Sequence, residues 1–225
     1  MIVPAIIPET KKDLFKKINY VKDSVDVVHI DICDGKYVPS VNWPIKFEWN
    51  DVEGLETGEE ELPGWDKLDF EVDLMVAKPL EALDHFVKIG ISSAIIHAEN
   101  LKEDFDHILK TAHEFDVMLG LAFLPGTNIN EYKDWILKVD FVQCMGISKI
   151  GYQGQDFDER VFDQIEKVRE VRPDVEIVVD GHVDEYNIQD LASMGVSKFV
   201  VGSAIFNSTS IPQKISELKQ LVKEV

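Results

Sequence analysis

The sequence predicts a (β/α)8 barrel, the TIM-barrel form of an α/β protein. Short apolar runs alternate with segments of helical periodicity along the whole chain, and eight such runs fit within its 225 residues. Doubly wound parallel sheets share this alternation and are the main alternative. Eight strand–helix units in a chain of this length favour the barrel. Because no linker divides the chain, we expect a single domain over residues 1–225.

The expected strands are rich in Val, Ile and Leu and are bounded by turn residues. They cover residues 2–7, 25–31, 68–75, 93–97, 117–122, 139–145, 175–180 and 198–201. The expected helices begin near Lys11, Leu80, Leu101, Asn130, Glu159, Glu185 and Ile211. The segment at Leu80 shows the pattern well, because Leu83, Phe86 and Val87 share one helical face. Pro79 stands just before it, where a first-turn proline fits.

The connection after the second strand departs from this pattern. Between Glu48 and Glu61 it holds seven acidic residues and no Lys or Arg, and Gly54, Gly58 and Pro63 interrupt any regular element. We interpret the region near 48–66 as a solvated acidic insertion, a loop outside the core. A lid or a partner-binding surface is the less supported alternative.

The composition limits the class of partner. Lys and Arg number 23 against 42 Asp and Glu, so the formal net charge is −19. Such a surface repels nucleic acid and anionic membranes, although backbone amides can still bind a small anion locally. No run approaches the ~18 apolar residues of a membrane span. With only Cys33 and Cys144 and no signal-like N-terminus, we expect a reduced, cytoplasmic protein.

The second strand carries the most informative residues. Alternation places His29, Asp31 and Cys33 on one face, and an Asp-Gly turn follows at Asp34 and Gly35. A buried carboxylate costs several kcal/mol unless it is paired or bound to a metal. A satisfied His–Asp pair would be the simplest explanation. Polar groups recur at the ends of other strands, however, and in a barrel these ends form the face that holds the active site.

Taken in order, these motifs resemble those of the ribulose-phosphate 3-epimerase family. The family's second strand reads His-x-Asp-x-Met-Asp-Gly-x-Phe-Val-Pro-Asn, and its third ends Asp-x-His-Leu-Met-Val. The similar segments here are residues 4–7, 29–40, 71–76, 97–99, 120–122, 125–127, 154–157, 179–183 and 201–206. The resemblance covers nearly the whole chain outside the acidic insertion. It supports the barrel and implies a phosphate-binding enzyme.

In that family two His and two Asp hold a divalent metal, and the two Asp act as acid and base on opposite faces of the substrate. The resemblance therefore implies catalytic roles for Asp31 and Asp180 and a metal site formed by His29, Asp31, Asp73 and Asp180. Asp73 stands where the family has a His. Three carboxylates form a harder set of ligands, which favours manganese, iron(II) or magnesium over zinc. The same change is also compatible with a site that binds no metal.

The implied reaction inverts C3 of a ketose phosphate, such as D-ribulose 5-phosphate to D-xylulose 5-phosphate, by two-base proton transfer through a metal-stabilised enediolate. Phosphate-binding residues would be Gly181, His182, Gly202 and Ser203, and Met75, Met145 and Gly154 would line the substrate pocket. The chain departs from the family pattern at three further places. Ala5 replaces a serine, His182 replaces a glycine, and the loop 146–153, with Lys149, lacks the family's Asn-Pro-Gly.

These departures keep two other functions open. One is a non-catalytic or regulatory barrel that binds a sugar phosphate without converting it. The other is an aldolase- or decarboxylase-type relative, for which we find no strand-end lysine and no Asp-x-Lys-x-x-Asp arrangement. We expect a phosphorylated ketose as the ligand and a homo-oligomeric assembly.

Overall fold

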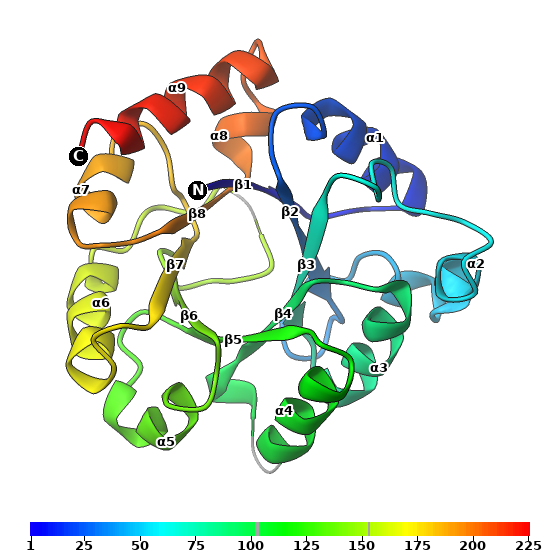
Figure 1. The fold of residues 1–225 in the computed structure, drawn as a ribbon, viewed down its shortest axis with the longest axis horizontal. Coiled ribbons are helices and arrows are strands. Elements are labelled where there is room, and N and C mark those ends of the chain that lie inside the picture. Colours follow the sequence, from blue (N-terminus) through cyan, green and yellow to red (C-terminus); the bar gives the residue numbers. More distant parts are fainter. Residues whose placement is uncertain (102–103, 153) are drawn as a thin grey trace.

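The computed structural model describes residues 1–101, 104–152 and 154–225. In these residues eight parallel strands close a barrel in sequence order, and helices form a ring outside it (Figure 1). Closure is made by β1, which pairs with β2 on one side and with β8 on the other. The predicted (β/α)8 barrel is confirmed. Among the described residues, none of the helices combines the length and the apolar character that a membrane span requires.

The strands lie close to their predicted positions. They are β1 (Ile2–Ile6), β2 (Val27–Cys33), β3 (Asp69–Met75), β4 (Ser93–His97), β5 (Met118–Phe123), β6 (Phe141–Met145), β7 (Glu176–Asp180) and β8 (Lys198–Val201). The largest shift is in β2, which begins and ends two residues later than expected. The extra residues place Cys33 inside the strand.

The main helices are α1 (Lys11–Val21), α3 (Pro79–Ile89), α4 (Phe105–Glu114), α6 (Arg160–Val171), α7 (Ile188–Ser193) and α9 (Ile211–Lys223). Shorter helical segments are η1 (Ile45–Phe47), η2 (Asn50–Val52), α2 (Glu53–Glu56), η3 (Ala98–Asn100), η4 (Ile129–Tyr132), α5 (Lys133–Ile136) and α8 (Ser203–Phe206). The helix expected from Leu101 begins instead at Phe105, and residues 102–103 of that expected helix lie outside the described residues.

The apolar core has two parts. Outward-facing strand residues such as Val28, Ile30 and Ile32 pack against the helix ring, where Leu14 and Ile18 of α1 are fully buried. A second cluster fills the barrel itself, with Val3, Ala5, Ile95, Phe141, Val178 and Val200 among its members. A Cβ on Gly120 would lie 2.2 Å from the Phe141 ring, so this glycine leaves the space that the ring occupies.

Strand register places the polar residues of the interior in layers. His29 of β2 pairs with Glu71 of β3, and Asp31 pairs with Asp73 two residues further along. Neighbouring residues in a parallel ladder point to the same side of the sheet. The register therefore brings two polar pairs into the barrel, one above the other.

The acidic insertion near 48–66 is more than the solvated loop that we expected. It contains η2 and α2, and its residues Val52, Leu55 and Leu62 are buried in the main core cluster. Its charge is partly paired, since Lys11 Nζ of α1 lies 2.7 Å from Glu60 Oε2. The sequence did not reveal this apolar set, because only a few residues of a largely acidic segment face the core.

Candidate active site

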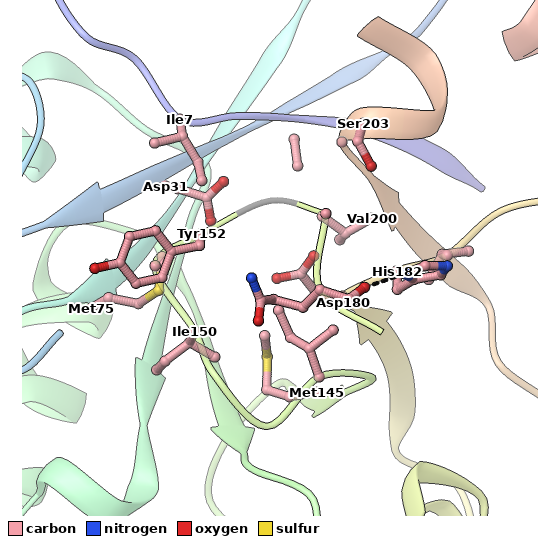
Figure 2. Close-up of a pocket in the computed structure, with 18 residues that line it drawn as sticks. Ile7, Asp31, Met75, Met145, Ile150, Tyr152, Asp180, His182, Val200 and Ser203 are labelled. Carbon is pink, nitrogen blue, oxygen red and sulfur yellow. Dashed lines mark hydrogen bonds between the residues drawn. The ribbon is translucent and has the colours of Figure 1, made fainter. Parts of the chain in front are cut away.

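Four ionisable side chains from three strands converge at the carboxyl-terminal end of the barrel. His29 and Asp31 come from β2, Asp73 from β3 and Asp180 from the last position of β7. One donor atom from each lies within 4.8 Å of the donor atoms of the other three. Figure 2 shows the carboxyl groups of Asp31 and Asp180 projecting into a common cavity. The structure thus brings together the four residues that the sequence singled out for a metal site.

The imidazole of His29 fits a metal-binding role. Its ring is fully buried, and Nδ1 lies 2.9 Å from Glu71 Oε1. The other nitrogen, Nε2, has no hydrogen-bond partner among the described residues and faces Asp31 Oδ1 at 3.6 Å and Asp73 Oδ2 at 3.9 Å. A buried nitrogen surrounded by carboxylate oxygens is a suitable place for a divalent cation, since neutral imidazole and carboxylate are common ligands of such ions.

Asp73 has two partners of its own. His97 Nε2 donates to Asp73 Oδ1 at 3.0 Å, and Gln143 Nε2 donates to Asp73 Oδ2 at 2.8 Å. Burial would raise the pKa of Asp73, but the charge and hydrogen bond of His97 outweigh it and lower the pKa. Asp73 is therefore held as a carboxylate.

Sequence reasoning assigned no role to His97 or Gln143. His97 was visible only as part of a matched motif, and Gln143 stands in the middle of an apolar strand. The one signal for Gln143 was its polar amide in an otherwise apolar strand. It stands two residues before Met145, so the two side chains point to the same face of the strand. Such a signal becomes specific only once β6 is known to lie across the barrel from Asp73.

Asp31 and Asp180 are unusual carboxylic acids. Burial, followed by the neighbouring charge of Asp31, raises the pKa of Asp180 to about 8. Burial also raises the pKa of Asp31, although His29 opposes the shift. Burial alone would lower the pKa of His29, but the nearby carboxylates of Asp31 and Glu71 raise the pKa well above its usual value. Two close carboxyl groups that cannot both ionise easily are suited to act as an acid and a base.

One cavity joins the remaining predicted residues. It is lined by Asp31 and Asp180 together with Met75, Met145, Gly154, Gly181, His182, Gly202 and Ser203 (Figure 2). Ala5, the position that replaces the family's serine, also lines it, whereas Lys149 is exposed and does not. Gln153, in the loop that precedes Gly154, lies outside the described residues. Ile7, Ile150 and Tyr152 also line the cavity, and none of these three had been predicted as a site residue.

The backbone is closely packed where β6 and β7 end. Gly181 has a φ of 106°, and a Cβ there would lie 2.7 Å from the Ile147 side chain. His182 also has a positive φ, 51°, and its Nδ1 donates to the carbonyl of Gln155 in the loop after β6. The imidazole of His182 therefore lies between the two loops. This contact is drawn as a dashed line in Figure 2.

Comparison with known proteins identifies the family. The model of the ribulose-phosphate 3 epimerase family matches residues 1–206. The chain belongs to the ribulose-phosphate 3-epimerase family. The ribulose-phosphate 3-epimerase of Aquifex aeolicus (strain VF5) is 27% identical over 209 residues, which cover 90% of this chain and 87% of the relative. The ribulose-phosphate 3-epimerase of Chlamydia muridarum is 31% identical over 208 residues, which cover 87% of this chain and 83% of the relative.

A solved structure extends the comparison of the fold. The 3-hexulose-6-phosphate synthase of Salmonella typhimurium superimposes with a TM-score of 0.71 at 15% identity, covering 99% of this chain and 98% of that one. At such low identity the likeness concerns the fold alone. The ribulose-phosphate 3-epimerase family consists of isomerases that act on phosphorylated sugars, and this member carries a His/Asp cluster able to hold a metal ion.

Proposed function

We propose that the protein is a metal-dependent 3-epimerase of a ketose phosphate, which interconverts D-ribulose 5-phosphate and D-xylulose 5-phosphate or a closely related pair. The observation that carries this proposal is the placement of Asp31 and Asp180. Their carboxyl groups reach one cavity from strands β2 and β7, within a cluster whose donor atoms lie within 4.8 Å of one another. Epimerisation next to a ketone needs two proton-transferring groups around a single carbon.

The chemistry assigned to these residues is a balanced pair of proton transfers. The carboxylate on one face of the substrate takes the proton from C3, and the electron pair of the broken C–H bond moves toward the carbonyl oxygen as the enediolate forms. The carboxylic acid on the other face then donates its proton to C3, which inverts the centre. In the metal-free protein the pKa of Asp180 is raised to about 8, and we assign Asp180 as the proton donor in one direction.

His29, Asp31, Asp73 and Asp180 would hold the divalent cation. When bound, such an ion supplies electrophilic stabilisation of the negative charge that develops on the substrate oxygens. With one imidazole and three carboxylates, we propose that the site prefers manganese, iron(II) or magnesium over zinc. Asp73 is kept ionised for this role by its hydrogen bonds from His97 and Gln143.

The rest of the cavity would orient the sugar phosphate. Gly181 and Gly202, with His182 and Ser203, would bind the phosphate where β7 and β8 end, since backbone N–H groups there can approach the anion closely. The buried Met75 and Met145 would form an apolar floor that excludes water from the reacting carbon. Gly154 would contact the sugar from the loop after β6.

The decisive experiment follows deuterium at C3. Protein purified without chelator is incubated in D2O with D-ribulose 5-phosphate and with manganese, iron(II), magnesium or zinc, and the products are read by NMR. We expect deuterium at C3 and the appearance of D-xylulose 5-phosphate, both lost in Asp180→Asn. Absence of exchange with every pentulose and hexulose phosphate tested would contradict the proposal.

A second candidate is a barrel that binds a sugar phosphate without converting it. The observation that favours it is the state of Asp73, which replaces the family's histidine and already accepts hydrogen bonds on both oxygens. Calorimetry with the same sugar phosphates separates the candidates. Binding without deuterium exchange, unchanged in Asp180→Asn, would favour the binding protein over the enzyme.

A further inference from the structure

A buried ion pair lies directly behind His29. Lys198 Nζ contacts Glu71 Oε2 at 2.9 Å, and the two residues are only 6% and 1% exposed. Lys198 begins β8, yet its side chain reaches across the barrel interior to β3 and places Nζ 5.0 Å from the centre of the Phe141 ring. Ser93 Oγ is a weaker third partner of the carboxylate at 3.4 Å. The resemblance to the family assigned no role to either charged residue.

Stability alone does not account for such a pair. Removing two charges from water costs several kcal/mol for each ion, and replacing a buried ion pair by apolar residues of similar volume is often neutral or stabilising. Most of the surrounding barrel interior is apolar, with Val27, Ile95 and Val178 as examples. An apolar pair would therefore fill the same space at lower cost, and the retained charges call for another reason.

The remaining oxygen of Glu71 supplies that reason. Glu71 Oε1 lies 2.9 Å from His29 Nδ1, while Oε2 is occupied by the Lys198 ammonium. A carboxylate paired with an ammonium can only accept hydrogen bonds, so Nδ1 must carry a proton. The unpartnered Nε2 is then directed at Asp31 and Asp73, the two nearest carboxylates of the cluster. Carboxylates that orient metal-bound histidines in this way affect metal affinity strongly.

We propose that Glu71 is a positioning residue, held by Lys198, that fixes the ring and tautomer of His29 so that Nε2 is available to a cation. Lys198 has a second effect in this arrangement. It neutralises Glu71, so the carboxylate orients His29 without adding an uncompensated negative charge beside the cluster. The inference rests on the proposed function for its cation, whereas the state of His29 can be measured without one.

The test uses double variants. Removing only one of the two charges would leave the other buried without a partner, which can unfold the protein. Glu71→Gln/Lys198→Met keeps a neutral acceptor for His29, and Glu71→Leu/Lys198→Met removes it. Lys214→Met, which breaks a pair with Glu217 on α9, is the control. Three properties are measured: the 15N NMR shifts of the His29 ring in metal-free protein at a pH above the raised pKa of His29, where the ring is neutral; the affinity for Mn2+ by calorimetry; and the denaturant midpoint.

We expect graded effects. The wild type and Lys214→Met show a His29 proton on Nδ1 and bind Mn2+ equally. Affinity falls moderately in the Gln/Met variant and roughly 10- to 100-fold in the Leu/Met variant, where Nε2–H forms also appear. The denaturant midpoints of the double variants stay at or above that of the wild type, which separates positioning from a structural role.

Unchanged His29 shifts and unchanged Mn2+ affinity in the Leu/Met variant would overturn the inference. A wild type that binds no Mn2+, or any other divalent cation, would instead contradict the proposed function. In that case the NMR comparison still decides whether Glu71 controls the tautomer of His29.

Discussion

Asp180 acquires its chemistry from its surroundings at the end of β7. A solvated aspartate is ionised at neutral pH, whereas burial and the nearby Asp31 raise the pKa of Asp180 to about 8. Asp73 lies on β3, the strand next to that of Asp31. Its pKa is lowered because the charge and hydrogen bond of His97 outweigh the effect of burial. Neighbouring residues of one type thus take different protonation states because their hydrogen-bond partners differ.

Replacing either proton-transferring residue should stop turnover. Asp180→Asn and Asp31→Asn keep the size of the side chain but remove its proton-transfer capacity, so we expect kcat to fall at least ~100-fold. Gln155→Ala, at a residue that also lines the cavity but has no carboxyl group, is the matched control. Rates are measured by coupled assay and by C3 deuterium exchange. An Asp180→Asn enzyme within ~3-fold of the wild-type rate would assign proton transfer elsewhere.

Cation binding should depend on pH. Burial and the neighbouring charge of Asp31 raise the pKa of Asp180 to about 8 in the metal-free protein, so near neutrality Asp180 holds a proton that a cation must displace. Affinity for Mn2+ should therefore rise from about pH 6 to about pH 8, with proton release that shrinks as Asp180 ionises. Calorimetry in buffers of different ionisation heat measures both quantities. An affinity that is constant over this range would show that no proton is displaced.

Among the structural elements, the acidic insertion is held by a small apolar set. Val52, Leu55 and Leu62 are buried in the main core, while acidic residues around them pair with Lys11 and His85 or are exposed. The insertion is thus anchored to the barrel and follows β2, the strand that carries His29 and Asp31.

Truncating Leu55, one of the buried leucines of the insertion, should lower stability markedly. Leu55→Ala removes side-chain contacts within the core and should lower the free energy of unfolding by ~2–5 kcal/mol. The exposed neighbour Glu59→Ala should change it by less than ~0.5 kcal/mol. Urea unfolding followed by circular dichroism gives both values. Equal, small effects would mean that the insertion does not share the cooperative core.

The turn after β7 depends on one glycine. Gly181→Ala introduces a Cβ at φ 106° and 2.7 Å from Ile147, so the turn must shift where the phosphate would bind. We expect a loss of ~1–3 kcal/mol of stability and a higher KM for the sugar phosphate. Gly58→Ala is the control for backbone strain, since its φ is 74° and nothing lies within 4 Å of the added Cβ. A wild-type KM in Gly181→Ala would argue against phosphate at this turn.

At the scale of the whole molecule, the cluster links three strands, β2, β3 and β7, to one ligand. A cation that binds only the folded protein stabilises it by about 2.7 kcal/mol at 100 times its Kd. For a chain of this size that corresponds to a rise in Tm of about 5–10 °C. Thermal unfolding with Mn2+, and again after EDTA, measures the rise and its reversal. A rise of the same size in Asp73→Asn/Asp180→Asn would place the ion outside the cluster.

Much of the fold could be read from local pattern. The Val- and Ile-rich runs predicted each strand to within about two residues, because alternation and turn residues act over short distances. His29, Asp31, Asp73 and Asp180 stood out for the same reason, as charges at the ends of apolar strands. The homo-oligomeric assembly and the cytoplasmic location stay predictions, with light scattering as the measurement for the first.

The sequence by itself determined the order of the elements, the barrel, and the ionisable residues at the carboxyl-terminal end of its strands. Only the tertiary structure decided which interior groups meet: Lys198 lies 127 residues from Glu71, and Gln143 lies 70 residues from Asp73. These contacts depend on strand register and barrel closure, which bring distant positions to the same depth. The neighbouring sequence does not show whether an isolated polar residue in an apolar strand has a partner, because the geometry of the closed sheet decides which side chains meet.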